Sequence, residues 1–209
     1  MKGIAMPIKP TIYIVDDNEG VRGALSLLLR TAGYATKSFA GAQQFLAEFD
    51  PSAPGCLLLD VRMPGMSGLE LQQWLSSRDI HIPVIIMTGH GDIAMAVQAM
   101  KDGASDFIEK PFLNQRVLDA VHKGVKDLLN RLQQAEQCQQ IQQRFAQLTP
   151  REHQVMTLLL DGKLNKQVAD NLNISVRTVE RHRLNFMEKL QARSLMEVAK
   201  LKLAGAIDG

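Results

Sequence analysis

The chain is poor in cysteine and has no long hydrophobic run. Its 209 residues include 2 cysteines, Cys56 and Cys138, which excludes a disulfide framework of the kind that stabilises small secreted domains. No apolar run approaches the ~20 residues of a membrane-spanning helix, and no signal-peptide pattern opens the sequence. We therefore expect a cytoplasmic protein without a membrane partner.

A strong net charge is also missing, since the formal charge at pH 7 is only +2. Residues 1–121 hold 10 Lys+Arg and 13 Asp+Glu, a difference of −3; residues 122–148 hold 4 and 2, a difference of +2; residues 149–209 hold 10 and 7, a difference of +3. The three differences add up to +2. A basic C-terminal part suggests a nucleic-acid partner there, although +3 alone is weak support.

Polar residues follow several short apolar runs in the first half of the chain. They are Asp16 and Asp17 after residues 12–15, Asp60 after 56–59, Thr88 after 84–87, and Lys110 just beyond 107–108. Apolar runs separated by helix-length segments predict buried parallel strands of an open α/β sheet. Ligands of such sheets bind beyond the C-terminal ends of the strands. We therefore expect three carboxylates, a hydroxyl and an ammonium group to converge in one pocket.

This set of side chains predicts phosphoryl chemistry. Three adjacent carboxylates repel one another without a cation, which predicts a hard divalent metal, most simply Mg²⁺. Mg²⁺ combines few carboxylates with waters and phosphate oxygens. Asp60 is then the candidate nucleophile that forms an aspartyl phosphate, while Thr88 and Lys110 can hold phosphoryl oxygens. The alternative, ordinary loop or cap residues, is easy to accept for one strand end and hard to accept for four.

Residues 10 to about 121 resemble the receiver domain of two-component response regulators. The resemblance rests on Val-Asp-Asp (15–17), Leu-Asp-Val-Arg-Met-Pro-Gly-Met-Ser-Gly (59–68), Met-Thr-Gly-His-Gly-Asp (87–92) and Glu-Lys-Pro-Phe (109–112). It implies a phosphoacceptor, Asp60; metal ligands from Asp16, Asp17, Asp60 and the backbone carbonyl of Arg62; and phosphate-sensing or switch residues Thr88, Lys110 and Phe107. It also implies a sensor histidine kinase as phosphoryl donor and a cis peptide bond before Pro111. His90, at the pocket rim, is a candidate for an effect on hydrolysis, or else an ordinary solvated histidine.

The fold expected for residues 10–121 is five βα units that build a five-stranded, parallel, doubly wound sheet of the flavodoxin-like type. The predicted strands span 11–15, 35–39, 55–60, 83–87 and 105–109. The predicted helices span 20–32, 42–49, 68–78 and 93–102, with a fifth from 113 onward.

The fifth helix has no evident end, so residues 122–147 form a helical linker. Its apolar residues at 125, 128, 132 and 135 have heptad spacing, and Cys138, Ile141, Phe145 and Leu148 continue the stripe after a three-residue shift. Two interpretations stay open. The linker is either a solvated helical spacer with a modest apolar stripe, or a coiled coil that joins two protomers.

Residues 148–209 carry signals for four short helices and none for a strand, which predicts a small all-α domain. The predicted helices span 151–160, 166–172 and 176–190, with a last one that opens near 194–197. The predicted N-caps are Thr149, Asn165, Ser175 and Ser194, the first and last in capping boxes with Glu152 and Glu197.

The second and third of these helices have the length and the turn of a helix-turn-helix. Arg177, Arg181 and Arg183 lie in the N-terminal half of the third helix, where a recognition helix meets base edges. Arg177 and Arg181 share a face with Leu184, which can touch a thymine methyl, whereas Arg183 lies about 200° from Arg181. Arginine there can grip phosphates or bind guanine through two hydrogen bonds. The alternative is a basic, solvated helix face.

Three motifs favour DNA binding, because they resemble a LuxR/FixJ-type DNA-binding domain. They are Leu-Thr-Pro-Arg-Glu (148–152), Asn-Lys-Gln-Val-Ala (165–169) and Ser-Val-Arg-Thr-Val-Glu-Arg-His-Arg (175–183). The DNA-binding residues implied are Asn165, Lys166, Ser175, Arg177, Thr178, Arg181, His182 and Arg183. Glu180 leaves two possibilities open. Its carboxylate either accepts a hydrogen bond from a cytosine amino group or is paired with Arg177, Arg183 or another base within the chain.

Together the two resemblances imply a response regulator of the FixJ/NarL family. A histidine kinase would phosphorylate Asp60, and the phosphorylated chain would form a homodimer, bind promoter DNA and act on RNA polymerase. We expect no enzymatic activity beyond self-phosphotransfer and slow autodephosphorylation. A phosphatase of the haloacid-dehalogenase type is disfavoured because Arg62 stands where that class needs a second acid. An RNA-binding antiterminator, or a receiver that acts only through protein contacts, is a further alternative.

Overall fold

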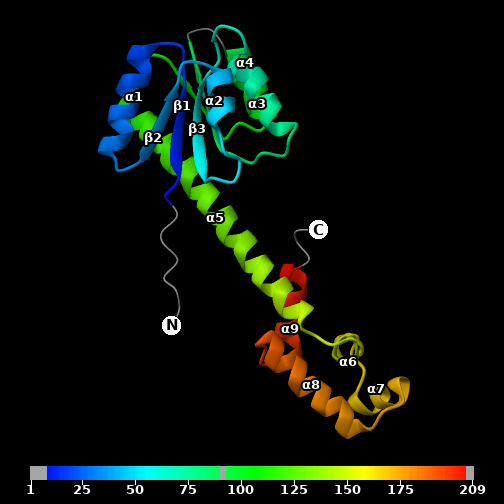
Figure 1. Ribbon diagram of the computed structural model, residues 1–209. Coiled ribbons are helices and arrows are strands. Elements are labelled where there is room, and N and C mark those ends of the chain that lie inside the picture. The colour runs from blue at the N-terminus through cyan, green and yellow to red at the C-terminus, as the bar shows by residue number, and fades with distance from the viewer. Residues whose placement is uncertain (1–8, 90–92, 206–209) are drawn as a thin grey trace. The chain divides into compact units, whose positions relative to one another are not determined.

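Five parallel strands alternate with five helices in the first part of the chain (Figure 1). The strands are β1 (Thr11–Val15), β2 (Ala35–Phe39), β3 (Gly55–Asp60), β4 (Val84–Thr88) and β5 (Asp106–Glu109). The helices are α1 (Glu19–Thr31), α2 (Ala42–Glu48), α3 (Gly68–Ser76), α4 (Ile93–Lys101) and α5 (Asn114–Ala146). This computed structural model describes residues 9–89 and 93–205. Within those ranges, no helix has both the length and the apolar character of a membrane span.

The sheet has the strand order β2-β1-β3-β4-β5, and its paired strands run parallel. The predicted five-stranded doubly wound sheet is therefore confirmed. Strand order reverses direction between β1 and β3, which opens a crevice beyond their C-terminal ends. Three predicted strand boundaries move by one residue: β4 begins at Val84 and ends at Thr88, and β5 begins at Asp106.

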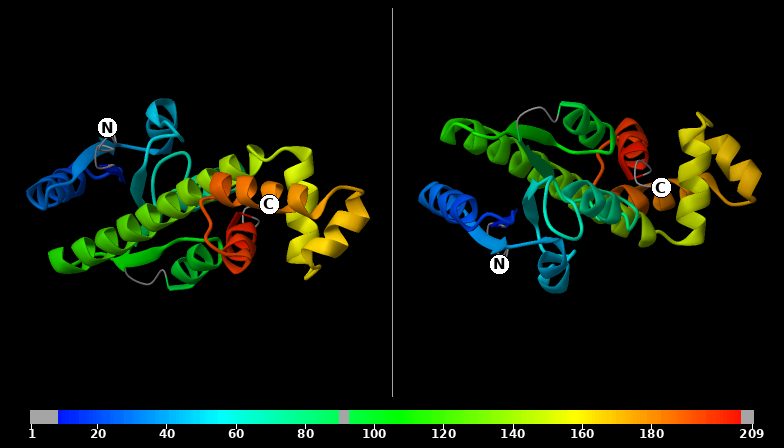
Figure 2. Two further views of the ribbon diagram at one scale, coloured as in Figure 1. Left: turned by 90° about the horizontal axis from the view of Figure 1, so that it is seen from below. Right: turned by 90° about the horizontal axis from the view of Figure 1, so that it is seen from above.

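Alternate residues of the central strands enter two separate hydrophobic clusters, one on each face of the sheet. In β3, Leu57 and Leu59 pack with α2 and α3, while Cys56 and Leu58 pack with α1 and α5. Figure 2 views this sheet along its strands, between its two helical layers. Both faces are buried, which is why the strand sequences are continuously apolar rather than alternating.

Helix α5 runs without interruption to Ala146. The chain forms two compact units, and the division between them falls within this helix, after Asn130. Its apolar stripe is largely used within the chain. Val125 belongs to the core of the first unit, and Cys138 is 7% exposed in the second unit, where its thiol donates to the carbonyl of Ala204 at 3.5 Å. Leu132 remains 36% exposed. The coiled-coil interpretation thus loses much of the seam that the heptad pattern suggested.

The second unit consists of the end of α5 and four helices, as its sequence predicts. They are α6 (Pro150–Leu160), α7 (Asn165–Leu172), α8 (Val176–Leu190) and α9 (Leu195–Gly205). Val155, Val179, Phe186 and Val198 are completely buried in their shared core.

Two of the four predicted caps form as expected, and one is wrong. The Thr149 box forms, with Glu152 N–H donating to Thr149 Oγ1 at 3.2 Å and Thr149 N–H donating to Glu152 Oε2 at 2.8 Å. Ser175 caps α8 by accepting from Thr178 N–H at 3.1 Å. The N-cap of α7 is Leu164 rather than Asn165, because the Gln167 side chain turns back to accept from Leu164 N–H at 2.9 Å.

The box predicted at α9 forms only in part. Ser194 Oγ accepts from Glu197 N–H at 3.2 Å. The Glu197 carboxylate, however, accepts from Arg193 N–H at 2.8 Å instead of from Ser194 N–H. The acid therefore reaches one residue further back, and it satisfies a donor outside the box.

Glycine is required at position 68, where α3 begins against the end of β3. A Cβ built there would overlap the backbone carbonyl of Asp60. We expect Gly68→Ala to destabilise the first unit by about 1–3 kcal/mol, because main chain must move to admit the methyl group. Trp74 on α3 is the only tryptophan of the chain, so its fluorescence reports thermal or denaturant unfolding there.

Gly23 is the matched control for this substitution. It lies inside α1 with nothing within 4 Å of a built Cβ. Gly23→Ala should leave the unfolding midpoint unchanged or raise stability by roughly 0.5–1 kcal/mol, since alanine favours a helix. Equal effects of both substitutions would show that no close approach exists at Gly68.

Candidate functional site: an acidic pocket and a helix-turn-helix

The sheet brings the three predicted carboxylates together at the crevice beyond β1 and β3. One oxygen each from Asp16, Asp17 and Asp60 lies within 4.8 Å of the others. Asp16 is completely buried and Asp60 is 6% exposed, whereas Asp17 is exposed at the mouth. Two of the acids are thus buried and one faces solvent.

Lys110 joins the two buried carboxylates. Its Nζ lies 2.6 Å from Asp16 Oδ2 and 2.8 Å from Asp60 Oδ1. Three ionised carboxylates contribute −3 and the ammonium contributes +1, which leaves −2 in the pocket. One divalent cation would neutralise the remaining charge. The close oxygens and this balance fit a hard metal ion with oxygen ligands.

The environment shifts the proton affinities of both members of the Lys110–Asp60 pair. Burial raises the pKa of Asp60, and the neighbouring Asp16 and Asp17 add to this, against the opposing hydrogen bond and charge of Lys110. Burial by itself lowers the pKa of Lys110, but its hydrogen bonds and charge interactions with Asp16 and Asp60 raise the pKa overall. The lysine is therefore held in its charged form.

Three contacts that the sequence did not predict hold Asp16 in place. Its side chain accepts from Asn18 N–H at 2.9 Å, and its carbonyl accepts from the Arg22 guanidinium at 2.8 Å. Its own N–H donates to the carbonyl of Phe39 on β2 at 3.2 Å. The orientation of this acid is fixed by the main chain on both sides.

Thr88 ends β4 beside Lys110, as predicted. The Thr88 side chain is buried, and its carbonyl accepts from Lys110 N–H at 2.7 Å. The peptide bond between Lys110 and Pro111 is cis, which confirms that expectation. Arg62 lies in the loop after β3. His90 lies outside the described residues.

Phe107 lies on β5, with 42% of the residue exposed. Its backbone is held from both sides: the N–H donates to Asp106 Oδ1 at 2.8 Å, and the carbonyl accepts from Arg116 at 2.8 Å. Arg116 of α5 also grips both oxygens of Asp106, at 2.8 and 2.9 Å. Partial burial raises the pKa of Asp106, but Arg116 and the Phe107 N–H lower it overall. The aromatic ring thus projects from a fixed piece of main chain.

In the second unit, α7 and α8 form the predicted helix-turn-helix. Asn173 adopts a left-handed conformation with φ 53°, which asparagine tolerates well, and Ser175 then caps α8. Val168 and Ala169 of α7 and Val179 of α8 are buried between the helices. The turn leaves one face of the first two turns of α8 exposed, while Val179 on the opposite face is buried.

One face of α8 is exposed. Arg177, Arg181 and Leu184 are exposed, and Leu184 is 71% exposed despite its apolar side chain. Arg183 is half-buried, on the side of the helix that also carries Val179. This division agrees with the predicted separation of Arg181 from Arg183 around the helix axis.

The remaining DNA-binding candidates fall on the same two helices. Lys166 and Ser175 are exposed, and Asn165, Thr178 and His182 are half-buried. Thr178 is engaged locally, since its hydroxyl lies 2.8 Å from that of Ser175. Nδ1 of His182 is buried without a hydrogen-bond partner among the described residues.

Glu180 is exposed on α8. Across the described part of the chain, no ion pair joins its carboxylate to Arg177, Arg183 or another base. Pairing within the chain is thus not seen among the described residues, and the hydrogen bond to a cytosine amino group stays a prediction.

An ion pair that the sequence did not predict joins the buried Glu152 of α6 to the half-buried Lys189 of α8. Lys189 Nζ, near the end of α8, lies 2.7 Å from Glu152 Oε2 and also donates to the carbonyl of Gln147 at 3.2 Å. Burial raises the pKa of Glu152, yet Lys189 and the Thr149 hydrogen bonds lower it overall. Of the two residues, the sequence predicted a structural role only for Glu152, as a member of a capping box.

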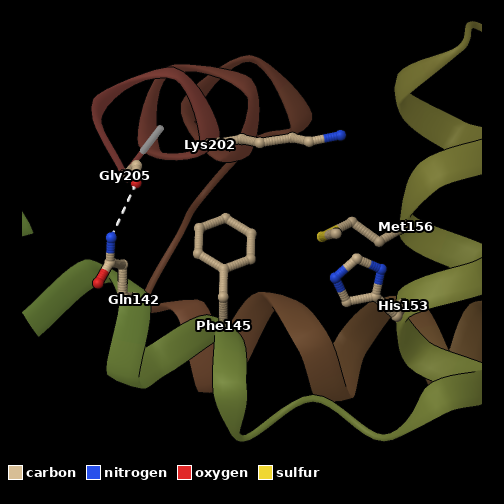
Figure 3. Close-up of a pocket in the computed structure, with 6 residues that line it drawn as sticks. All are labelled: Gln142, Phe145, His153, Met156, Lys202 and Gly205. Carbon is tan, nitrogen blue, oxygen red and sulfur yellow. Dashed lines mark hydrogen bonds between the residues drawn. The ribbon is translucent and has the colours of Figure 1, made fainter. Parts of the chain in front are cut away.

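A cavity of about 260 Å³ lies beside α9 in the same unit (Figure 3). Phe145 from α5 stands at its centre, Met156 and His153 line it from α6, and Lys202 extends over it from α9. Gln142 donates to the carbonyl of Gly205 at 3.2 Å and so binds the end of α9 to α5.

Two family comparisons match the two units. The response regulator receiver domain matches residues 12–122, and the luxR family of bacterial regulatory proteins matches residues 146–201. The chain belongs to the response regulators of the FixJ/NarL family. Like its relatives, this response regulator is a phosphorylation-controlled regulator of transcription, with a receiver domain that implies a sensor kinase partner and a LuxR-type domain that implies DNA binding.

The similarity of this response regulator to others extends over almost the whole chain. The transcriptional regulatory protein FixJ of Azorhizobium caulinodans is 41% identical over 202 residues, which cover 97% of this chain and 96% of that protein. FixJ of Rhizobium meliloti is 43% identical, with 93% and 96% covered. The response regulator protein TodT of Pseudomonas putida is 42% identical, with 91% and 84% covered.

Solved structures give the same assignment. The response regulator StyR superposes with a TM-score of 0.85 at 46% identity, covering 93% of this chain and 98% of that one. Full-length FixJ from B. japonicum superposes with a TM-score of 0.60 at 40% identity, covering 96% and 99%.

Proposed function

We propose that Asp60 is the phosphoacceptor of this response regulator. The observation that carries the proposal is the position of its carboxylate, which lies at the end of a central strand, between two further acids and in contact with Lys110. A carboxylate oxygen of Asp60 attacks phosphorus, and the bond from phosphorus to the donor breaks, so that an acyl phosphate forms. The donor is the phosphorylated histidine of a sensor kinase, or a small acyl phosphate.

Asp16, Asp17 and Asp60, with the backbone carbonyl of Arg62, are the proposed ligands of Mg²⁺. Such an ion would neutralise charge that develops on the phosphoryl oxygens. Lys110 already lies within hydrogen-bond distance of Asp60, so it can hold one phosphoryl oxygen without a large movement. Thr88, buried at the adjacent strand end, supplies a hydroxyl for another.

Thr88 and Phe107 are proposed to transmit phosphorylation to the surface formed by α4, β5 and α5. Exposed apolar residues already lie there, with Val97 50% and Leu113 79% exposed. A phosphoryl group that pulls on Thr88 can shift a population between two arrangements only through contacts that differ between them. The favoured arrangement is a homodimer, and the receiver surface is a better candidate for it than the linker stripe, which the chain itself largely covers.

The exposed face of α8 is the proposed DNA-binding surface. Arg181 and Arg177 point away from the domain core and can enter a major groove. Arg183, on the flank, is placed for a phosphate contact. Asn165, Lys166, Ser175, Thr178 and His182 complete the proposed set around the helix-turn-helix.

The remaining parts of the proposal follow from promoter binding. RNA polymerase is the expected further partner, and the cytoplasm is the expected compartment because the DNA lies there. The functional division is a receiver at 10–121, a linker at 122–147 and a DNA-binding domain at 148–209. The chain has no proposed catalytic turnover beyond self-phosphotransfer and slow autodephosphorylation.

Asp60→Asn should abolish labelling by radiolabelled acetyl phosphate, because an amide cannot form the acyl phosphate. Asp17→Asn should keep the domain folded but weaken Mg²⁺ binding several-fold, measured by titration of Trp74 fluorescence. Asp79→Asn, on an exposed loop away from the pocket, is the control and should be labelled normally. Stoichiometric, acid-stable labelling of the Asp60→Asn protein would contradict the assignment.

Thr88→Ala should still accept a phosphoryl group at Asp60 but dimerise less, because the variant lacks the hydroxyl that would contact the phosphoryl group. Sedimentation velocity of the fully phosphorylated proteins measures this, with Thr36→Ala on the edge strand β2 as the matched control. Unchanged dimerisation of the Thr88 variant would place the signal on another route.

Arg181→Ala should cost roughly 1–3 kcal/mol on the specific DNA site and relax preference at one base pair. Arg183→Ala should weaken all duplexes alike and reduce the salt slope by about one unit. Titrations on specific and scrambled duplexes at several salt concentrations separate the two roles, and Arg193→Ala, beyond α8, is the control. Unchanged affinity of both variants would defeat the assignment of α8 as the recognition helix.

A further inference from the structure

Glu180 is an acidic side chain among the arginines in the N-terminal half of α8, the part of the helix that the proposed function turns toward DNA. Glu180 is exposed, about 60° around the axis from Arg177 and about 40° from Leu184, as helical geometry requires for spacings of three and four residues. It lies in the second turn of the helix, near the end that enters the groove.

Within the described residues, no ion pair neutralises the carboxylate of Glu180. Helix partners of Glu180 would stand three or four residues away, and the only bases at those positions are Arg177 and Arg183. Neither forms an ion pair with it in the described part of the chain. Arg183 is half-buried against the packing side, and Arg177 lies on the exposed side.

An unneutralised carboxylate is unfavourable beside a polyanion unless a base offers it a hydrogen bond. The ionised group is acceptor-only, so it is repelled by guanine O6 and N7 and by thymine O4. Adenine offers an amino group beside the acceptor N7, whereas cytosine offers an amino group with no acceptor on its own major-groove edge. Cytosine is therefore the base that a carboxylate prefers.

We propose that Glu180 is a specificity residue, which accepts a hydrogen bond from the exocyclic amino group of a cytosine in the major groove. The proposal rests on the proposed DNA binding by α8 and adds the identity of one base. Binding energy from Arg177 and Arg181 holds the helix in the groove, and Glu180 rejects sites that lack the donor.

Selection from a randomised duplex library tests this directly. Full-length protein, phosphorylated with acetyl phosphate and Mg²⁺, is compared with Glu180→Ala and Glu180→Gln, and with Glu188→Gln as an equal charge change on an exposed residue two turns further along α8. We expect the unaltered protein to prefer cytosine at one position by roughly tenfold or more. Glu180→Ala should lose that preference alone, and Glu180→Gln should move it toward adenine.

The outcomes separate the two proposals. If the unaltered protein, the Glu180→Ala variant and the control all select the same sequence, Glu180 has no role in specificity. DNA binding by α8 would remain intact in that case. The same holds for a preference for guanine or thymine at the position that Glu180→Ala relaxes. Failure of the unaltered protein to select any sequence would overturn the proposed function together with this inference. Loss of preference in Glu188→Gln as well would assign the effect to net charge and so overturn the role of Glu180.

Discussion

Electrostatic repulsion among three carboxylates is the constraint on which the receiver unit depends. A parallel sheet places the ends of β1 and β3 side by side, and Asp16 and Asp60 are buried there. Without a cation, such a pair would oppose folding. Lys110, which directly follows the far strand β5, offsets that cost through two short contacts. The site is therefore complete only when the sheet has assembled from β1 to β5.

The strands and the pocket were predictable because both depend on patterns that are local in sequence. Continuous apolar runs identify buried parallel strands, and a topological rule then places their polar ends together. The contacts of Asn18 and Arg22 with Asp16 depend on the path of one loop, and the need for glycine at position 68 depends on how closely α3 approaches β3. Neither leaves a signal in residue type or spacing.

In the second unit, too, features set by neighbouring residues were predictable, whereas contacts between distant residues were not. The capping residues at Thr149 and Ser175 follow from short-range geometry and were found, whereas a glutamine that reaches back to Leu164 replaced the expected Asn165 cap. The heptad pattern of α5 was real, but periodicity does not specify a partner. Cys138 is covered by α9 of the same chain, and a coiled coil between two protomers stays a prediction.

The placement of the two cysteines gives each unit its own chemical reporter. Cys56 lies in the core of the sheet, where burial raises the pKa of its thiol to about 12, and Cys138 lies beneath the end of α9. A thiol reacts as its thiolate and only when reagent reaches it, so alkylation at either position requires local opening. The rates of modification at the two sites, separated by peptide mapping, measure how often each unit opens independently of the other.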